Sequence, residues 1–83
     1  METLTLNDGT LLENSRAIIS RDLFLYINGI DLRCAFDLLI DPEKTKKILF
    51  TQINGENVIF RGYTQMIAIR DEGNGMISAV LTK

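Results

Sequence analysis

Apolar and polar residues alternate along most of the chain, at the two-residue period of half-buried β-strands. The alternation starts over residues 2–6 and resumes beyond Asn7-Asp8-Gly9. A glycine in the third loop position suits a hairpin with a bulge, and this register places Leu4 opposite Leu12. Similar runs predict about six to eight short strands in all. The later runs cover residues 16–20, 23–27, 48–53, 57–63, 64–70 and 76–82.

The strongest two-residue hairpin signal in the chain is Asn54-Gly55. Pairing Ile53 with Glu56 around this turn sets Phe50 opposite Ile59. The two halves of the chain also share a plan, in which a hairpin with a turn glycine is followed by an interruption and a second hairpin. A duplicated β unit, with a helix between its copies, would explain this likeness.

One stretch has a helical period instead. Its apolar positions fall at i, i+3, i+4 and i+7, namely Leu32, Ala35, Phe36 and Leu39. Asp31 can cap this helix by accepting a hydrogen bond from an unpaired backbone N–H. Asp41-Pro42-Glu43-Lys44 predicts one more helical turn, with proline at the first position, where no N–H is needed. The predicted fold class is therefore α+β, with mostly antiparallel β hairpins and one central amphipathic α-helix in a single domain over residues 1–83.

Charge adds a restriction on partners. The 83 residues include nine basic and eleven acidic side chains, which give a net charge of −2. Binding to nucleic acid needs clustered cations, and the only cluster in the sequence is Lys44, Lys46 and Lys47. Because Asp41 and Glu43 lie beside these lysines, the cluster is more typical of a solvated turn. We therefore do not expect nucleic acid as a partner.

The cellular location follows from the cysteine count and the hydropathy pattern. Cys34 is the only cysteine, so the chain forms no internal disulfide, which suits a reducing compartment. No run approaches the ~18 consecutive apolar residues of a membrane span. Residues 1–12 also lack the basic start and apolar run of a signal peptide. We expect a protein of the cytoplasm, or of an assembly made there, without membrane contact.

Groups suited to catalysis or metal binding are scarce. Histidine is absent, and Cys34 therefore has no imidazole to activate its thiol. Asp71, Glu72 and Asn74 share a loop, but they lack the ligand spacing of a calcium-binding EF-hand loop. The glycines lie between strand-like runs, whereas a phosphate cradle needs them at the entry to a helix. The sequence predicts no enzyme, no metal site and no cofactor.

A binding role is what remains. Short strands with few residues to cover them leave an edge or an apolar face exposed, and small domains often cover such surfaces by pairing with a copy or a partner. The candidate interface residues are Phe24, Tyr26, Phe50 and Tyr63. Basic residues are not interleaved around these aromatics, as a platform for single-stranded nucleic acid would require. We expect a non-catalytic protein-binding module that forms a homo-oligomer.

Three segments carry a resemblance to a known group of proteins. They are Leu4-Thr5-Leu6-Asn7-Asp8-Gly9-Thr10, Leu38-Leu39-Ile40-Asp41-Pro42-Glu43-Lys44-Thr45, and the run from Phe60-Arg61-Gly62-Tyr63-Thr64 to Ala79-Val80-Leu81. Together they look similar to small phage and prophage proteins of Gram-positive gut bacteria.

The resemblance implies a protein of a mobile element that acts by binding. One implied role is a counter-defence inhibitor, either anti-CRISPR-like or a sponge for a nucleotide signal. The other is a minor structural component of a phage tail or head. The implied partner is a bacterial defence protein or a virion protein, in the host cytoplasm or in the virion. The resemblance transfers no site residue.

Overall fold

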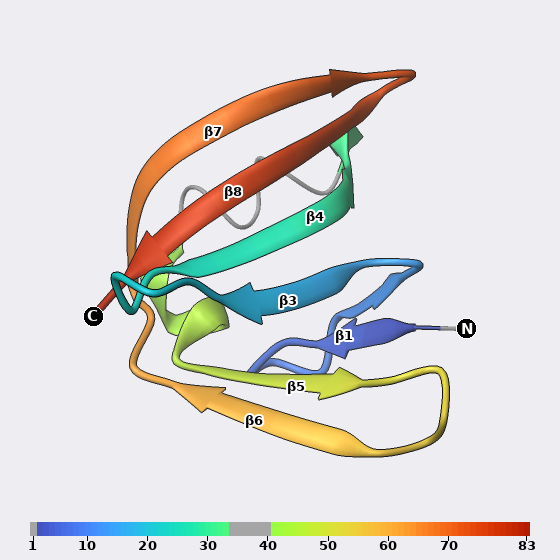
Figure 1. The fold of residues 1–83 in the computed structure, drawn as a ribbon, viewed down its shortest axis with the longest axis vertical. Helices are drawn as coiled ribbons and strands as arrows, with labels where there is room; N and C mark the ends of the chain where they lie inside the picture. Colours follow the sequence, from blue (N-terminus) through green and yellow to red (C-terminus); the bar gives the residue numbers. More distant parts are fainter. Residues whose placement is uncertain (1, 34–40) are drawn as a thin grey trace.

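The computed structural model describes residues 2–33 and 41–83, and its strands form two four-stranded antiparallel sheets (Figure 1). Sheet A has the strand order β2-β1-β5-β6, and sheet B has the order β3-β4-β8-β7. The strands are β1 (Thr3–Thr5), β2 (Leu11–Glu13), β3 (Arg16–Ile19), β4 (Leu25–Asp31), β5 (Lys47–Thr51), β6 (Asn57–Arg61), β7 (Gln65–Gly73) and β8 (Met76–Thr82).

The predicted α+β class is wrong, because the described residues are nearly all β and contain no helix longer than the 3₁₀ helix η1 (Pro42–Thr45). Residues 2–33 and 41–83 contain no central amphipathic helix. Positions 35, 36 and 39 of its expected apolar face lie outside the described residues, and the Leu32 side chain is 51% exposed. The physical reason lies partly in β4, which continues to Asp31 and buries Ile30 opposite Ile77. Pairing in the sheet thus extends to Asp31, which we had assigned as the cap of the helix.

The short helix η1 is the helical turn that the sequence predicted. The Oδ1 atom of Asp41 accepts a hydrogen bond from the backbone N–H of Glu43 at 3.0 Å. Pro42 takes the first position, where its missing N–H has no cost. This capped turn leads the chain directly into β5.

The hairpin between β1 and β2 has the register that the sequence predicted, with Leu4 opposite Leu12. Its loop contains three residues, and the backbone N–H of Leu6 donates to the Thr10 carbonyl across the loop at 2.8 Å. Gly9 closes the loop with a φ of 90°, which glycine adopts without a steric penalty. A three-residue loop with a bulge therefore sets this register.

The hairpin between β5 and β6 uses the same loop, so our predicted register is wrong by one residue. A two-residue turn of the expected type needs positive φ at both positions, whereas here Gly55 has it and Asn54 does not. The Oδ1 atom of Asn54 accepts the backbone N–H of Glu56 at 3.0 Å and so stabilises the longer loop. Phe50 consequently lies opposite Val58.

The strand order supports the duplicated β unit suggested by the sequence. Each half of the chain, β1–β4 or β5–β8, gives its first hairpin to sheet A and its second to sheet B. If β1–β4 are exchanged with β5–β8, each sheet keeps the same order of strands, read from its opposite edge. Leu4 pairs with Phe50 at the middle of the β1–β5 contact, and Ile27 pairs with Ala79 between β4 and β8. These pairs lie near an approximate twofold axis, and all four side chains are buried.

The core lies between the inner faces of the two sheets, and β3 runs beside β1 where the sheets meet (Figure 1). Its buried apolar members are Leu4, Leu6, Leu12, Ala17, Leu25, Ile27, Ile30, Ile48, Phe50, Tyr63, Ile77, Ala79 and Leu81. The far end of the β7–β8 hairpin projects away from sheet A (Figure 1). Most side chains of β7 are therefore exposed.

Candidate functional site

Two of the four candidate interface residues belong to the core. Phe50 is 6% exposed on the inner face of β5, and Tyr63 is 7% exposed between β6 and β7. The Tyr63 ring meets the Phe60 ring edge to face at a centroid distance of 6.3 Å, and the Lys83 Nζ lies 5.2 Å from its centroid. These contacts support packing, and both side chains offer little area to another molecule.

Tyr26 has the opposite environment. It lies on the outer face of β4, 39% exposed, between the buried residues Leu25 and Ile27. Phe24 precedes it by two positions and is half-buried just outside the strand. The structure therefore separates the candidate aromatics into an exposed region near the start of β4 and a buried pair elsewhere.

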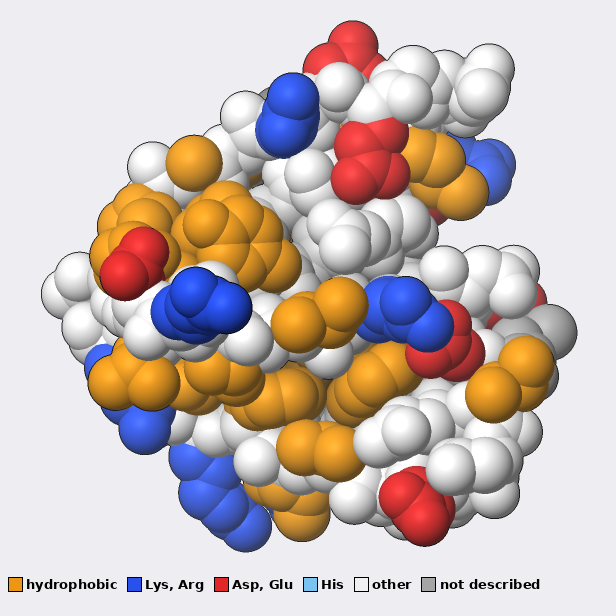
Figure 2. Space-filling view, viewed as in Figure 1, with side chains coloured by type: hydrophobic (Ala, Val, Ile, Leu, Met, Phe, Trp, Pro, Cys, Tyr) orange, Lys and Arg blue, Asp and Glu red, His pale blue; other side chains and the backbone are white. Residues whose placement is uncertain are grey.

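Tyr26 is part of an apolar row that crosses all four strands of sheet B. The row, called the Tyr26 row below, consists of Ile18, Tyr26, Val80 and Ala68. Each of these residues lies directly opposite the next in the antiparallel register, so their side chains share the outer face. Figure 2 shows hydrophobic side chains at the surface over neighbouring parts of β8, β4 and β3, with single cationic side chains between them. Apolar area of this kind is typical of contact surfaces.

A shallow hollow of about 560 Å³ lies against the Tyr26 row. Its polar wall includes Asn28, Ser78 and Arg70, and Arg70 pairs with Ser78 across β7 and β8. Tyrosine and arginine are the residue types that most often carry binding energy at protein interfaces. This hollow places both types beside an apolar row.

The outer face of sheet A has an apolar row of its own. This row, called the Leu49 row below, consists of Leu11, Thr5, Leu49 and Ile59. Next to it, Lys47 and Arg61 lie directly opposite each other, and both are exposed. Neither cation has an ion pair or hydrogen bond with any residue in the described ranges. We call these two residues the cation pair.

Sequence reasoning missed most members of both rows. Ile18 and Val80 are ordinary β-strand residues, and no local motif distinguishes them from core positions. Ile18 becomes a neighbour of Tyr26 through the register of the β3–β4 hairpin, and Val80 does so through the pairing of β4 with β8, which are far apart in the chain. The available signal was the alternation within β4, which placed Phe24 and Tyr26 on one face.

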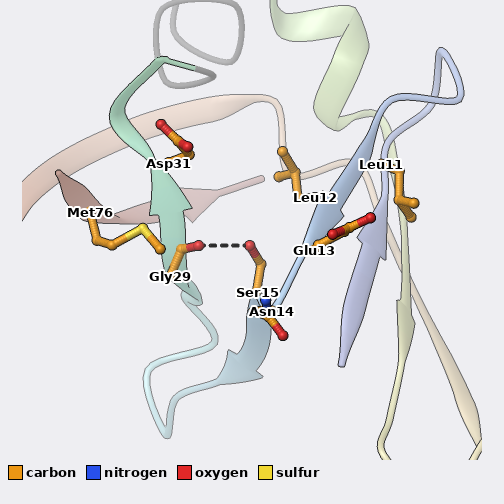
Figure 3. Close-up of a pocket in the computed structure, with 8 residues that line it drawn as sticks. All are labelled: Leu11, Leu12, Glu13, Asn14, Ser15, Gly29, Asp31 and Met76. Carbon is orange, nitrogen blue, oxygen red and sulfur yellow. Dashed lines mark hydrogen bonds between the residues drawn. The ribbon is translucent and has the colours of Figure 1, made fainter. Parts of the chain in front are cut away.

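A second hollow, of about 320 Å³, opens where the β2–β3 connection meets β4 (Figure 3). Inside it the buried Ser15 hydroxyl donates to the Gly29 carbonyl at 2.9 Å. A Cβ atom on Gly29 would lie 2.8 Å from the Asn14 carbonyl oxygen. The connection therefore packs tightly on the β4 bulge, and this hollow borders a structural joint.

The Asp31 carboxylate on the wall of this hollow is already occupied. The Arg33 side chain donates to Asp31 at 2.7 and 3.2 Å, and the Arg33 backbone N–H donates at 2.9 Å. These hydrogen bonds, from the side chain first and the backbone second, lower the pKa of Asp31 to about 2. An acid with so low a pKa is ionised near neutral pH and cannot supply a proton there.

Within residues 2–33 and 41–83, no group of three His, Cys, Asp or Glu side chains gathers in a position to hold a metal ion. The same ranges contain no helix with the length and apolar character needed to cross a bilayer.

Comparison with known proteins adds no relative. No protein-family model matches the chain, and no curated protein or solved structure is significantly similar to it.

Proposed function

We propose that this chain is a non-catalytic protein-binding module and that it binds its partner through the outer face of sheet B. The observation that carries the proposal is the Tyr26 row, an exposed apolar strip that crosses four strands with a tyrosine near its middle. Burying such side chains contributes about 25 cal/mol for each Å² removed from water. A flat sheet face with a shallow hollow suits the surface of another protein.

Two biological roles use a surface of this kind. We favour a counter-defence inhibitor of a phage or prophage, which would act in the host cytoplasm by covering a bacterial defence protein. The alternative is a minor structural component of a tail or head. Purified virions separate these roles, because a structural component remains in them through purification, whereas an inhibitor does not.

The binding proposal is tested by affinity capture from host lysate with wild-type protein, Tyr26→Ala and a matched control. The control is Ile53→Ala, which truncates an exposed apolar residue at the tip of the β5–β6 loop. Truncating a central interface tyrosine typically costs about 2 kcal/mol or more. We therefore expect Tyr26→Ala to weaken partner affinity by about 30-fold or more, and Ile53→Ala to retain it.

Once the partner is identified, titration calorimetry with the three proteins gives this ratio directly. Equal affinities for Tyr26→Ala and wild type, with unchanged thermal stability, would rule out the sheet B face as the binding surface. Sustained turnover of a substrate by the purified chain would refute the non-catalytic assignment.

A further inference from the structure

The cation pair and the Leu49 row together form an exposed surface, and its two cations have no acidic partner within the described part of the molecule. Other lysines near this end of sheet A have acidic neighbours, because Lys46 pairs with Glu43 at 3.3 Å and Lys44 with Asp8 at 3.7 Å. Lys47 and Arg61 instead lie directly opposite each other. Like charges opposite each other on a sheet repel, so an anionic group placed between them would relieve the repulsion.

The positions on this surface follow a fixed spacing. Lys47 and Leu49 are two residues apart on β5, and Arg61 and Ile59 are two residues apart on β6. Residues two apart on a strand share a face and lie about 6.5–7 Å from each other. The surface therefore presents two cations beside two apolar side chains at this spacing.

The complementary pattern exists on β7. Ile69 and Asp71 are also two residues apart, and they pair with Ala79 and Ile77 on the inner side of the β7–β8 hairpin. Ile69 is 45% exposed although it faces this side, because the hairpin projects away from sheet A (Figure 1). Asp71 is exposed too, and its Oδ1 atom accepts the Gly73 backbone N–H at 2.8 Å. Its second carboxylate oxygen has no hydrogen-bond partner among the described residues.

We propose that sheet A of one copy of this chain binds the β7–β8 hairpin of a second copy, with Asp71 at the cation pair and Ile69 on the Leu49 row. Charge complementarity and the shared two-residue spacing select a second copy as the occupant. A hollow of about 230 Å³ beside Lys47, Leu49 and Ile59 provides room for the Ile69 side chain. Asp71 also lines the hollow against the Tyr26 row, but Ile69 and the surface on sheet A do not, so the contact goes beyond the proposed binding function.

The symmetry of the contact predicts the form of the assembly. The two surfaces differ and lie on different sheets, so a molecule bound through one of them still offers the other. Such head-to-tail contacts produce rings or open chains rather than closed dimers. The mass should therefore increase beyond that of a dimer with concentration, and it should fall at high salt because exposed charges are screened.

Sedimentation equilibrium on the full chain tests the contact with two variants that each remove one side. Lys47→Glu with Arg61→Glu reverses the cation pair, and Asp71→Lys reverses the acid. Each variant alone should be monomeric at concentrations where wild type associates. An equimolar mixture should regain assembly beyond a one-to-one complex, because the intact Asp71 of the first variant meets the intact cation pair of the second, and their two reversed surfaces also carry opposite charges.

Two matched variants control for net charge and for folding. Arg16→Glu with Arg21→Glu changes the net charge as much as reversal of the cation pair, removes only the exposed ion pair of Arg16 with Glu2, and should still assemble. Asp71→Asn keeps the Oδ1 acceptor for the Gly73 N–H and should weaken assembly with little change in thermal stability. A strictly monomeric wild type, assembly unaffected by either reversal, or capture of an acidic external protein or nucleic acid by the cation pair of a monomer would each overturn the proposal.

Discussion

The joint between the β2–β3 connection and β4 gives a prediction that separates backbone strain from packing. Gly29 and Gly55 both have positive φ, 76° and 87°, so an alanine at either position takes an unfavourable backbone conformation. A new Cβ atom on Gly55 would meet nothing within 4 Å, whereas on Gly29 it would lie 2.8 Å from the Asn14 carbonyl oxygen. The pair Gly29→Ala and Gly55→Ala therefore differs mainly in a single steric contact.

The magnitudes follow from the two environments. Left-handed backbone costs a residue with a Cβ about 1–2 kcal/mol, and the loss of glycine's unfolded-state freedom returns about 0.5–1 kcal/mol. Gly55→Ala should thus lower the free energy of unfolding by about 0.5–1 kcal/mol. Gly29→Ala adds overpacking, which costs about 1–3 kcal/mol. It also strains the hydrogen bond from the buried Ser15 hydroxyl to the Gly29 carbonyl, a bond worth about 1 kcal/mol. The total loss should be about 2–4 kcal/mol.

Urea unfolding followed by far-ultraviolet circular dichroism measures both variants against wild type. For a domain of this size a change of 1 kcal/mol moves Tm by about 4–8 °C, so thermal melts also distinguish them. Gly29→Ala should unfold at clearly lower urea than Gly55→Ala, with a similar slope. Equal losses in the two variants would show that the β2–β3 connection does not pack on Gly29 as described.

Two further predictions concern Leu23 and Asp31. Leu23 holds the third position of the β3–β4 loop with a φ of 65° and is 72% exposed. Leu23→Gly should therefore raise the free energy of unfolding by about 0.5–1 kcal/mol, and a lower melting temperature would contradict this. The pKa of Asp31 falls from 3.8 to about 2 on folding because Arg33 donates to it, so this carboxylate stabilises the fold above pH 3.8 and loses that contribution as the pH falls toward 2. An NMR titration of the Asp31 carboxyl carbon should show a midpoint near 2, and a midpoint near 4 would refute the Arg33 contacts.

The errors in the sequence interpretation have definite physical causes. The helix prediction relied on a 3.6-residue period that starts at Leu32, but periodicity does not report that β4 extends to Asp31 through pairing with β8. The one-residue error in the β5–β6 register arose because Asn54-Gly55 fits two loop lengths. The loop that forms is the one in which Asn54 accepts the Glu56 N–H.

The candidate interface residues also differ in whether the sequence could predict their exposure. Alternation within β4 was enough to place Tyr26 on one face of a strand. Tyr63 lies in the short connection between β6 and β7, where no strand period applies, and its burial depends on Phe60, Lys83 and the core around them. Composition alone could not distinguish these two tyrosines.

The sequence by itself determined the local features of this protein: short strands from two-residue alternation, the β1–β2 register from Gly9, and the capped turn at Asp41. These features depend on backbone geometry and on neighbours within a few residues. Only the tertiary structure decided how the hairpins divide between two sheets and which strands lie side by side. The Tyr26 row and the Leu49 row depend on that pairing, because β4 with β8 and β1 with β5 are strands that are distant in the chain. The cation pair depends on the register of the β5–β6 hairpin, which the sequence pattern misplaced by one residue.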